Sequence, residues 1–129
     1  MTKTNFMEKY PVCTVEIQKS QTTFTNVTEI IEYLKSLVEA HEIAKFIATF
    51  NNYEHTNALG GEINPEIKDA QNLIFCFGAA IPNTKILAPR PRSFGIAELE
   101  DSFVVEFLEA PMQNLSDVMV KWAKSIANK

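Results

Sequence analysis

The sequence predicts an α+β fold: a single-layer, mainly antiparallel sheet with two amphipathic helices packed on one face. Several short segments alternate apolar and polar residues, as strands do, and two longer segments repeat apolar residues at helical spacing. Two of the strand segments are joined by a short acidic turn and are read as a hairpin. The expected order is strand, helix, strand, long loop, strand, hairpin and helix.

The N-terminal part contains the first strand and the clearest helix. Residues 1–10 are interpreted as a flexible leader, and residues 12–17 alternate as a strand with one wet face. Asn26 is a candidate helix cap, and Glu29 stands three residues later, as in a capping box. We expect the helix to end near His41, which can interact with the helix dipole when protonated. Its apolar stripe is Val27, Ile30, Ile31, Leu34, Leu37 and Val38.

A second strand is predicted at residues 45–51. The polar stretch at residues 52–72 is long for a loop in a compact domain, and such loops are often functional or contain a short element. A helical turn is plausible at residues 65–70, because Pro65 suits the first helical position. The second-strand side chains expected to share one face are Phe46, Ala48 and Phe50.

The C-terminal half is predicted to contain three strands and the last helix. The unbroken apolar run at residues 73–77 indicates a central strand. Residues 93–98 and 102–108 are expected to pair as the hairpin. The last helix is predicted to start near Asn114 or Ser116. Its apolar stripe is Leu115, Val118, Met119, Trp122 and Ile126.

Length and charge exclude several classes of protein. With 129 residues, the chain is expected to form one domain over residues 1–129. The net charge is −4 and no basic face is apparent in the sequence, so no nucleic-acid partner is expected. No segment approaches the roughly 20 apolar residues that span a membrane. The polar N-terminus does not resemble a secretory signal, so a cytoplasmic protein without a membrane partner is expected.

The cysteines and histidines do not form a recognisable metal site. Cys13 and Cys76 lie in apolar, strand-like segments and are expected to be buried, reduced thiols. Neither belongs to a CxxC pair, and the chain has only two histidines, without ligand spacing. We therefore expect neither a bound metal nor a cofactor.

Two clusters are candidates for a functional site. His55, with Glu54 and Asn57 beside it in the long loop, could act as a general base or donate a hydrogen bond. The alternative is a loop-anchoring or solvated histidine. Arg90 and Arg92 lie on a proline-stiffened loop and could clamp a carboxylate or phosphate. The alternative is surface charge paired with nearby glutamates.

Three local features accompany this order of elements: a His-containing loop at residues 54–58, Phe77-Gly78 at the end of a strand and Ala110-Pro111 after the hairpin. With these features, the chain resembles the DUF302 or TT1751-like family of small bacterial α+β proteins over roughly residues 12–112. That resemblance implies an α+β fold and a tendency to self-associate, and it implies no established reaction.

We therefore expect a non-catalytic, small-ligand-binding or accessory protein that acts as a homodimer. The aromatic supply is generous for one core, which favours the homodimer. The expected ligand is a small anionic or amphipathic molecule between the His55 loop and residues 89–92. Two alternatives stay open: an enzyme with His55 as general base and Glu54 orienting it, or an interaction subunit that binds another protein through its exposed sheet face. The residues expected to contact the ligand are Arg90, Arg92, His55, Phe77 and Phe94.

Overall fold

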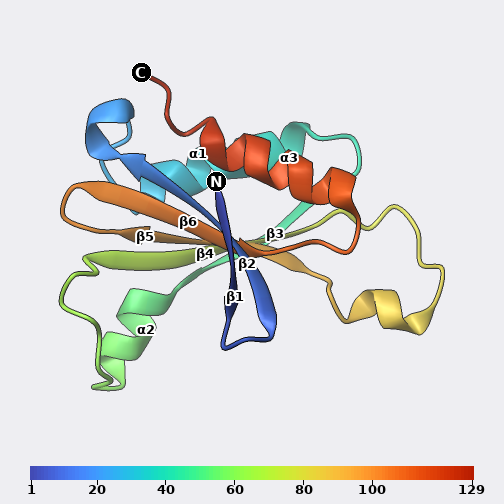
Figure 1. The fold of residues 1–129 in the computed structure, drawn as a ribbon, viewed down its shortest axis with the longest axis horizontal. Helices are drawn as coiled ribbons and strands as arrows, with labels where there is room; N and C mark the ends of the chain where they lie inside the picture. Colours follow the sequence, from blue (N-terminus) through green and yellow to red (C-terminus); the bar gives the residue numbers. More distant parts are fainter.

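The computed structural model describes residues 1–129 and confirms the α+β fold (Figure 1). One six-stranded sheet has the order β1-β2-β6-β5-β4-β3, and every neighbouring pair is antiparallel. The strands are β1 (Thr2–Phe6), β2 (Tyr10–Gln18), β3 (Lys45–Asn51), β4 (Asp69–Cys76), β5 (Arg92–Glu98) and β6 (Ser102–Leu108). The helices are α1 (Val27–Ala40), α2 (Asn52–Ala58) and α3 (Gln113–Lys124), with 3-10 turns at Lys19–Gln21 and Thr84–Leu87.

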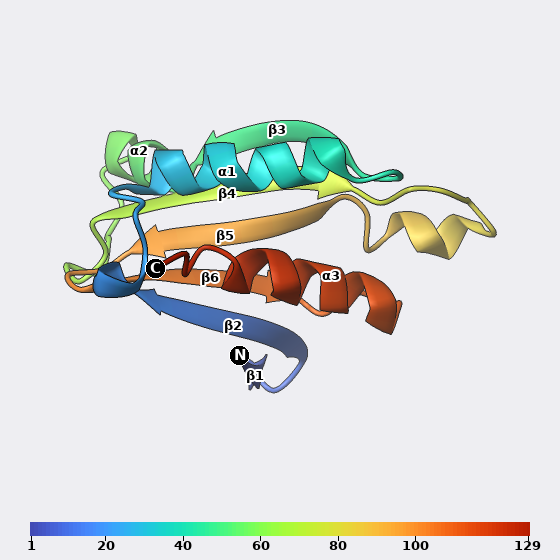
Figure 2. The same cartoon turned by 90° about the horizontal axis from the view of Figure 1, so that it is seen from above.

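The two long helices cover one face of the sheet, as Figure 2 shows from above. In that view α1 lies along β3 and β4, and α3 lies over the other half of the sheet. The prediction of two helices is incomplete, because α2 is a third helix outside this layer. It has only 7 residues and no buried side chain, so it has no apolar stripe that a sequence pattern could reveal. Asn51 caps it by accepting a hydrogen bond from the backbone N–H of Glu54 at 2.9 Å.

A single hydrophobic core of 19 buried residues lies between the sheet and the long helices. Most of the phenylalanines whose number favoured a homodimer are buried in this core. The aromatic content therefore does not require a second chain. The fully or nearly fully buried phenylalanines are Phe75, Phe77, Phe94, Phe103 and Phe107.

Helix α1 begins and ends almost where the sequence predicts. The Oδ1 atom of Asn26 accepts a hydrogen bond from the Glu29 backbone N–H at 2.8 Å. The Glu29 carboxylate reaches back one residue further than in the usual capping box, because it accepts from both the N–H and the hydroxyl of Thr25 at 2.7 Å. These bonds lower the pKa of Glu29 below its ordinary value.

The segment expected to be a loose leader contains an edge strand. β1 pairs with β2 from Thr2 opposite Thr14 to Phe6 opposite Tyr10. All five residues of β1 are exposed, so the strand carries no apolar pattern that would reveal it in the sequence. Its formation depends on the neighbouring strand that supplies its hydrogen-bond partners.

A β-bulge changes the expected face pattern of β3. The register shifts between Phe46 and Ala48, so Phe46 stands opposite the buried Phe75, whereas Ala48 stands opposite Ile74 on the other face. The prediction that Phe46, Ala48 and Phe50 share one face is therefore wrong. The extra residue, Ile47, reverses the alternation that a regular strand would have.

Strand β4 begins earlier than the apolar run predicts. Asp69 pairs with Glu98, and the Lys68 N–H donates to the Glu98 carbonyl at 2.8 Å. Of the helical turn expected at residues 65–70, only a single turn is present, closed by a hydrogen bond from the Ile67 N–H to the Asn64 carbonyl at 3.0 Å, and residues 69 and 70 belong to the strand. Alternation along β4 also places Cys76 on the face opposite the core, where it is half-buried rather than buried. Cys13 lies on the core face, and both cysteines are free thiols.

Candidate functional site

A small cavity lies where the loop at residues 79–91 meets the start of α3. Its volume is about 40 Å³, which is room for roughly three water molecules. Apart from two arginines its walls are mostly apolar, so a bound group would meet positive charge in a largely dry setting. The lining residues are Phe77, Ile86, Pro89, Arg90, Arg92, Ala110, Pro111, Met112 and Leu115. We call it the Arg92 cavity.

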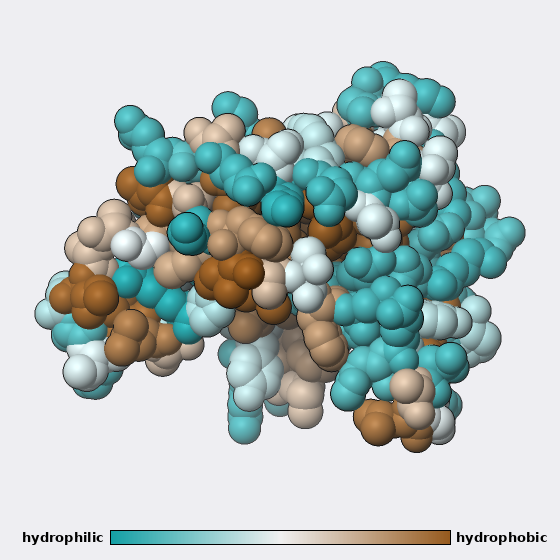
Figure 3. All heavy atoms as spheres, turned by 180° about the vertical axis from the view of Figure 1, so that it is seen from behind, coloured by the Kyte–Doolittle hydropathy of each residue, from teal (hydrophilic) through white to brown (hydrophobic).

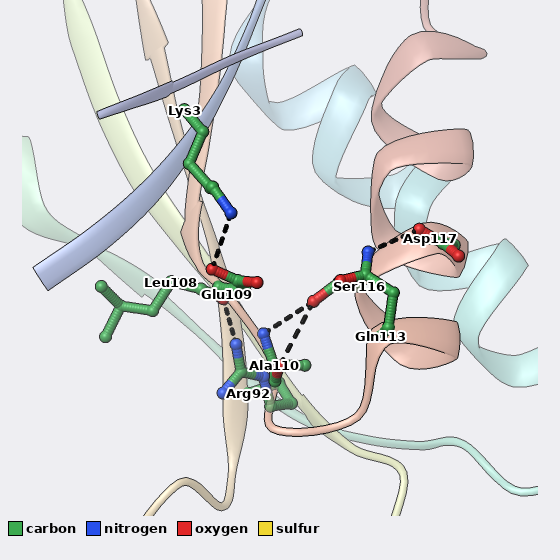
Figure 4. Close-up of polar contacts among 8 residues, drawn as sticks. All are labelled: Lys3, Arg92, Leu108, Glu109, Ala110, Gln113, Ser116 and Asp117. Carbon is green, nitrogen blue, oxygen red and sulfur yellow. Dashed lines mark hydrogen bonds and ion pairs between the residues drawn. The ribbon is translucent and has the colours of Figure 1, made fainter. Parts of the chain in front are cut away.

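Arg92 is the first residue of β5 and faces the core side of the sheet, opposite Phe75. Its side chain is largely enclosed, and the residue is only 8% exposed. The guanidinium donates from Nη1 to the Pro89 carbonyl at 3.3 Å. It also donates from Nη2 to the Leu108 carbonyl (Figure 4). Its Nε is buried without a hydrogen-bond partner. A strong donor is thus held inside the protein with its Nε–H unused.

No carboxylate neutralises this guanidinium. None of the ion pairs in the structure includes Arg92. Glu109, which follows Leu108, is instead paired with Lys3 at 3.2 Å (Figure 4). Cys13 supplies no counter-charge either, because burial raises the pKa of its thiol and keeps it neutral at neutral pH.

Burial therefore acts on Arg92 without compensation from a carboxylate. It lowers the pKa of the guanidinium from its ordinary value. Arginine nevertheless remains protonated in proteins, so the charge stays in place. A buried charge satisfied only by neutral carbonyls is costly, and an anion bound beside it would remove part of that cost.

Arg90 is held beside the cavity by a separate contact. Its Nη2 donates to the Ala80 carbonyl at 2.7 Å, which fixes the side chain across the loop. Its guanidinium lies beside Gly78, where an added Cβ would be in ordinary contact with Arg90 Nη1 at 3.5 Å and in tighter contact with Cys76 Sγ at 3.1 Å. Both arginines thus lie in the cavity wall, with Arg90 half-buried and nearer the surface.

The remaining wall comes from the end of the hairpin and the start of α3. The Ser116 hydroxyl accepts a hydrogen bond from the Ala110 N–H at 2.8 Å and ties the two segments together (Figure 4). Met112 is the N-cap residue of α3, and its side chain provides no capping hydrogen bond. The positive end of the helix dipole therefore lies close to the cavity and adds to the field of the arginines.

A wider, more open groove of about 260 Å³ lies on the other side of Arg92. It is bounded by β2, the proline-rich loop and the end of β6. Arg92 thus lines both the small cavity and the wider groove. The groove-lining residues are Tyr10, Pro11, Ala88, Pro89, Pro91, Arg92, Ser93, Leu108 and Glu109.

Only part of the site expected from the sequence comes together. Phe77, Arg90 and Arg92 share the Arg92 cavity. Phe94 is fully buried in the core and does not line it. His55 lies on α2, at the opposite end of the sheet (Figure 1). The expected pocket between the His55 loop and residues 89–92 is therefore wrong.

The physical reason is the length of β4. Helix α2 precedes the Asp69 end of β4, whereas Phe77 and the arginine loop follow its Cys76 end. A strand of 8 residues spans roughly 26 Å at about 3.3 Å per residue, which is too far for one small ligand to bridge.

His55 and Glu54 are both exposed on α2. The imidazole lies against Phe50, with ring centroids 5.3 Å apart, and no hydrogen bond joins His55 to Glu54. Their catalytic role stays a prediction. No group of three or more His, Cys, Asp or Glu residues lies close enough to hold a metal ion.

Sequence reasoning missed the contribution of α3. Ala110, Met112 and Leu115 carry no chemical motif, and they reach the cavity only because the chain turns back after β6. The Ala110-Pro111 pair indicated where the hairpin ends, but it did not indicate that these two residues lie beside Arg92. No signal in the sequence connects these residues to the arginines.

A family model described as a family of unknown function, DUF6858, matches residues 1–128. The chain belongs to the DUF6858 family. No curated protein matches it. The matching family is not the DUF302 or TT1751-like family. The resemblance is correct only in that the chain belongs to an uncharacterised family and has an α+β fold. None of the helices is long and apolar enough to cross a membrane.

Proposed function

We propose that this DUF6858 protein binds a small organic anion in the Arg92 cavity, acts without catalysis of its own and works as a homodimer. The observation that carries the anion site is the buried Arg92 guanidinium, which belongs to a residue that lines the cavity, has no carboxylate partner and has an unused Nε. An anion that replaced the missing partner would form charge-assisted hydrogen bonds where little water competes.

A short aliphatic carboxylate fits this setting better than a larger or more highly charged group. The planar guanidinium matches a carboxylate, and the second arginine stands nearer the surface. The volume of about 40 Å³ admits little more than the head group and a short tail. The side chains of Phe77, Met112 and Leu115 would contact that tail.

The surface near this end of the molecule favours an amphipathic ligand. Figure 3 shows hydrophobic side chains gathered toward the end that carries the loop at residues 79–91, with hydrophilic side chains toward the α2 end. Ile81 and Leu87 of that loop are 70% and 53% exposed. A ligand with its carboxylate at Arg92 could lay a longer apolar part on these residues.

Calorimetric titration with acetate, butyrate and octanoate tests the anion site. We expect saturable binding of at least one acid, and we expect Arg92→Met to abolish it. Lys85→Met is the matched control, because it removes a positive charge from the same loop outside the cavity lining. If no acid binds, or if Arg92→Met and Lys85→Met bind alike, the proposed anion site is wrong.

A further inference from the structure

The turn between β1 and β2 is strained. Met7 and Glu8 have φ angles of 53° and 63°, in the left-handed region that side chains with a Cβ disfavour. Hydrogen bonds from Glu8 N to Asn5 O (3.1 Å) and from Lys9 N to Phe6 O (3.2 Å) hold the turn closed. Hairpins of this kind ordinarily place Asn-Gly at these positions, so closing this turn costs free energy that the favoured sequence would avoid.

Strand β1 contributes no residue to the hydrophobic core. All five of its residues are exposed, and β2 is its only neighbour in the sheet. Lys3 makes the one ion pair that links β1 to another element, with Glu109 just beyond β6. A β1 strand from another copy could make the same backbone pairs with β2 and the same ion pair.

The turn also exposes a group of large apolar side chains. Phe6, Met7 and Tyr10 are 60%, 69% and 49% exposed. Leu108 is 49% exposed and shares the open groove with Tyr10. In Figure 1 the turn projects from the body of the molecule, below the strands. Two such turns, opened and crossing at a two-fold axis, would cover each other's apolar side chains.

We propose that two copies of this chain exchange β1, so that the β1 of each chain pairs with the β2 of the other and residues 7–9 become an extended hinge. Each chain keeps its native strand pairing, both left-handed residues relax, and the apolar side chains at the hinge become buried. Short, strained hinges favour this kind of exchange. The inference rests on the homodimer of the proposed function and is independent of the anion site.

The strand register supplies a direct test. Lys3 lies opposite Cys13 in the β1–β2 pair. In a Lys3→Cys, Cys76→Ser variant, oxidation with diamide joins residues 3 and 13 within one chain if the hairpin is closed, and between two chains if β1 is exchanged. We expect a covalent dimer on a denaturing, non-reducing gel. The matched control, Cys76→Ser alone, should run as a monomer. An intrachain disulfide overturns the proposal, even if the protein is a dimer by light scattering.

Variants of the hinge test its cause. Met7→Asn with Glu8→Gly fits the left-handed turn and should lower the dimer fraction by light scattering at least several-fold. Glu8→Pro cannot adopt a positive φ, so it should raise that fraction. A wild-type protein that is monomeric at about 100 µM, or a dimer that neither hinge variant alters, overturns strand exchange. Anion binding by a monomer would leave the anion site standing, so the two proposals fail separately.

Discussion

Replacing Arg92 with methionine should separate the stability of this protein from its anion binding. Methionine has a similar length and suits an apolar wall, but it cannot donate to the Pro89 and Leu108 carbonyls. Hydrogen bonds from a charged donor contribute about 1.5–3 kcal/mol each, so losing two costs roughly 3–6 kcal/mol. Against that loss stands the removal of a buried, unneutralised charge, which is worth several kcal/mol. The two effects nearly cancel.

We therefore expect the free energy of unfolding of Arg92→Met to lie within about 2 kcal/mol of the wild-type value. Anion affinity should fall much further. Losing a guanidinium–carboxylate contact worth about 3 kcal/mol raises the Kd by roughly 100-fold or more. The change in stability is small because no carboxylate is left unpaired when Arg92 is removed.

Urea unfolding followed by tryptophan fluorescence measures the stability. The single tryptophan, Trp122, stacks on the cavity residue Phe77 with ring centroids 5.7 Å apart, so its emission reports on this part of the core. Calorimetry on the same samples measures binding, with Lys85→Met as the charge control. A loss of about 3–5 kcal/mol, the cost of breaking a buried ion pair, would refute the reasoning by revealing an acidic partner for Arg92.

Three further predictions concern the core, α1 and α2. Phe75→Ala removes a fully buried ring that stacks on Phe94 at 5.3 Å, so urea unfolding should show a loss of about 3–5 kcal/mol; a loss below 1 kcal/mol would contradict the core position. Glu29→Gln should destabilise the protein at neutral pH. Because the folded-state pKa of Glu29 is lowered, this carboxylate contributes stability above its unfolded-state pKa, and the contribution is lost as pH falls through the folded-state pKa. The melting temperatures of wild type and variant should therefore converge in acid. A difference in melting temperature that persists in acid would contradict a stabilising role for the bonds from Thr25. His55→Ala should leave the Kd for the carboxylic acid unchanged in calorimetry, because α2 lies beyond the far end of β4 from the Arg92 cavity. A several-fold change in that Kd would contradict the separation of His55 from the anion site.

The elements with strong apolar patterns could be predicted from the sequence. The stripe and cap of α1 were sufficient because a helix uses only nearby residues for its hydrogen bonds and its Asn26 cap. The β5–β6 hairpin was likewise evident, since its short acidic turn separates two alternating runs. In these segments the local preference and the tertiary environment agree.

The errors fall where pairing between strands, rather than a local residue pattern, decided the structure. β1 has no buried residue and exists because β2 supplies its hydrogen-bond partners. The bulge at Ile47 reversed the faces of β3, because one extra residue shifts the alternation of every residue that follows. Neither feature leaves a periodic signal in the sequence.

The candidate site shows the same division. The sequence by itself determined that two arginines flank a proline near an apolar strand, and that α1 and the hairpin form. The expectation that both arginines lie on a loop is wrong for Arg92, because Arg92 is the first residue of β5. Only the tertiary structure decided that Arg92 turns into the core side without an acid, that Met112 and Leu115 complete its cavity, and that His55 lies at the other end of the sheet. The reason is that burial and charge neutralisation depend on which distant segments the sheet brings together, and this information is absent from the local pattern of residues.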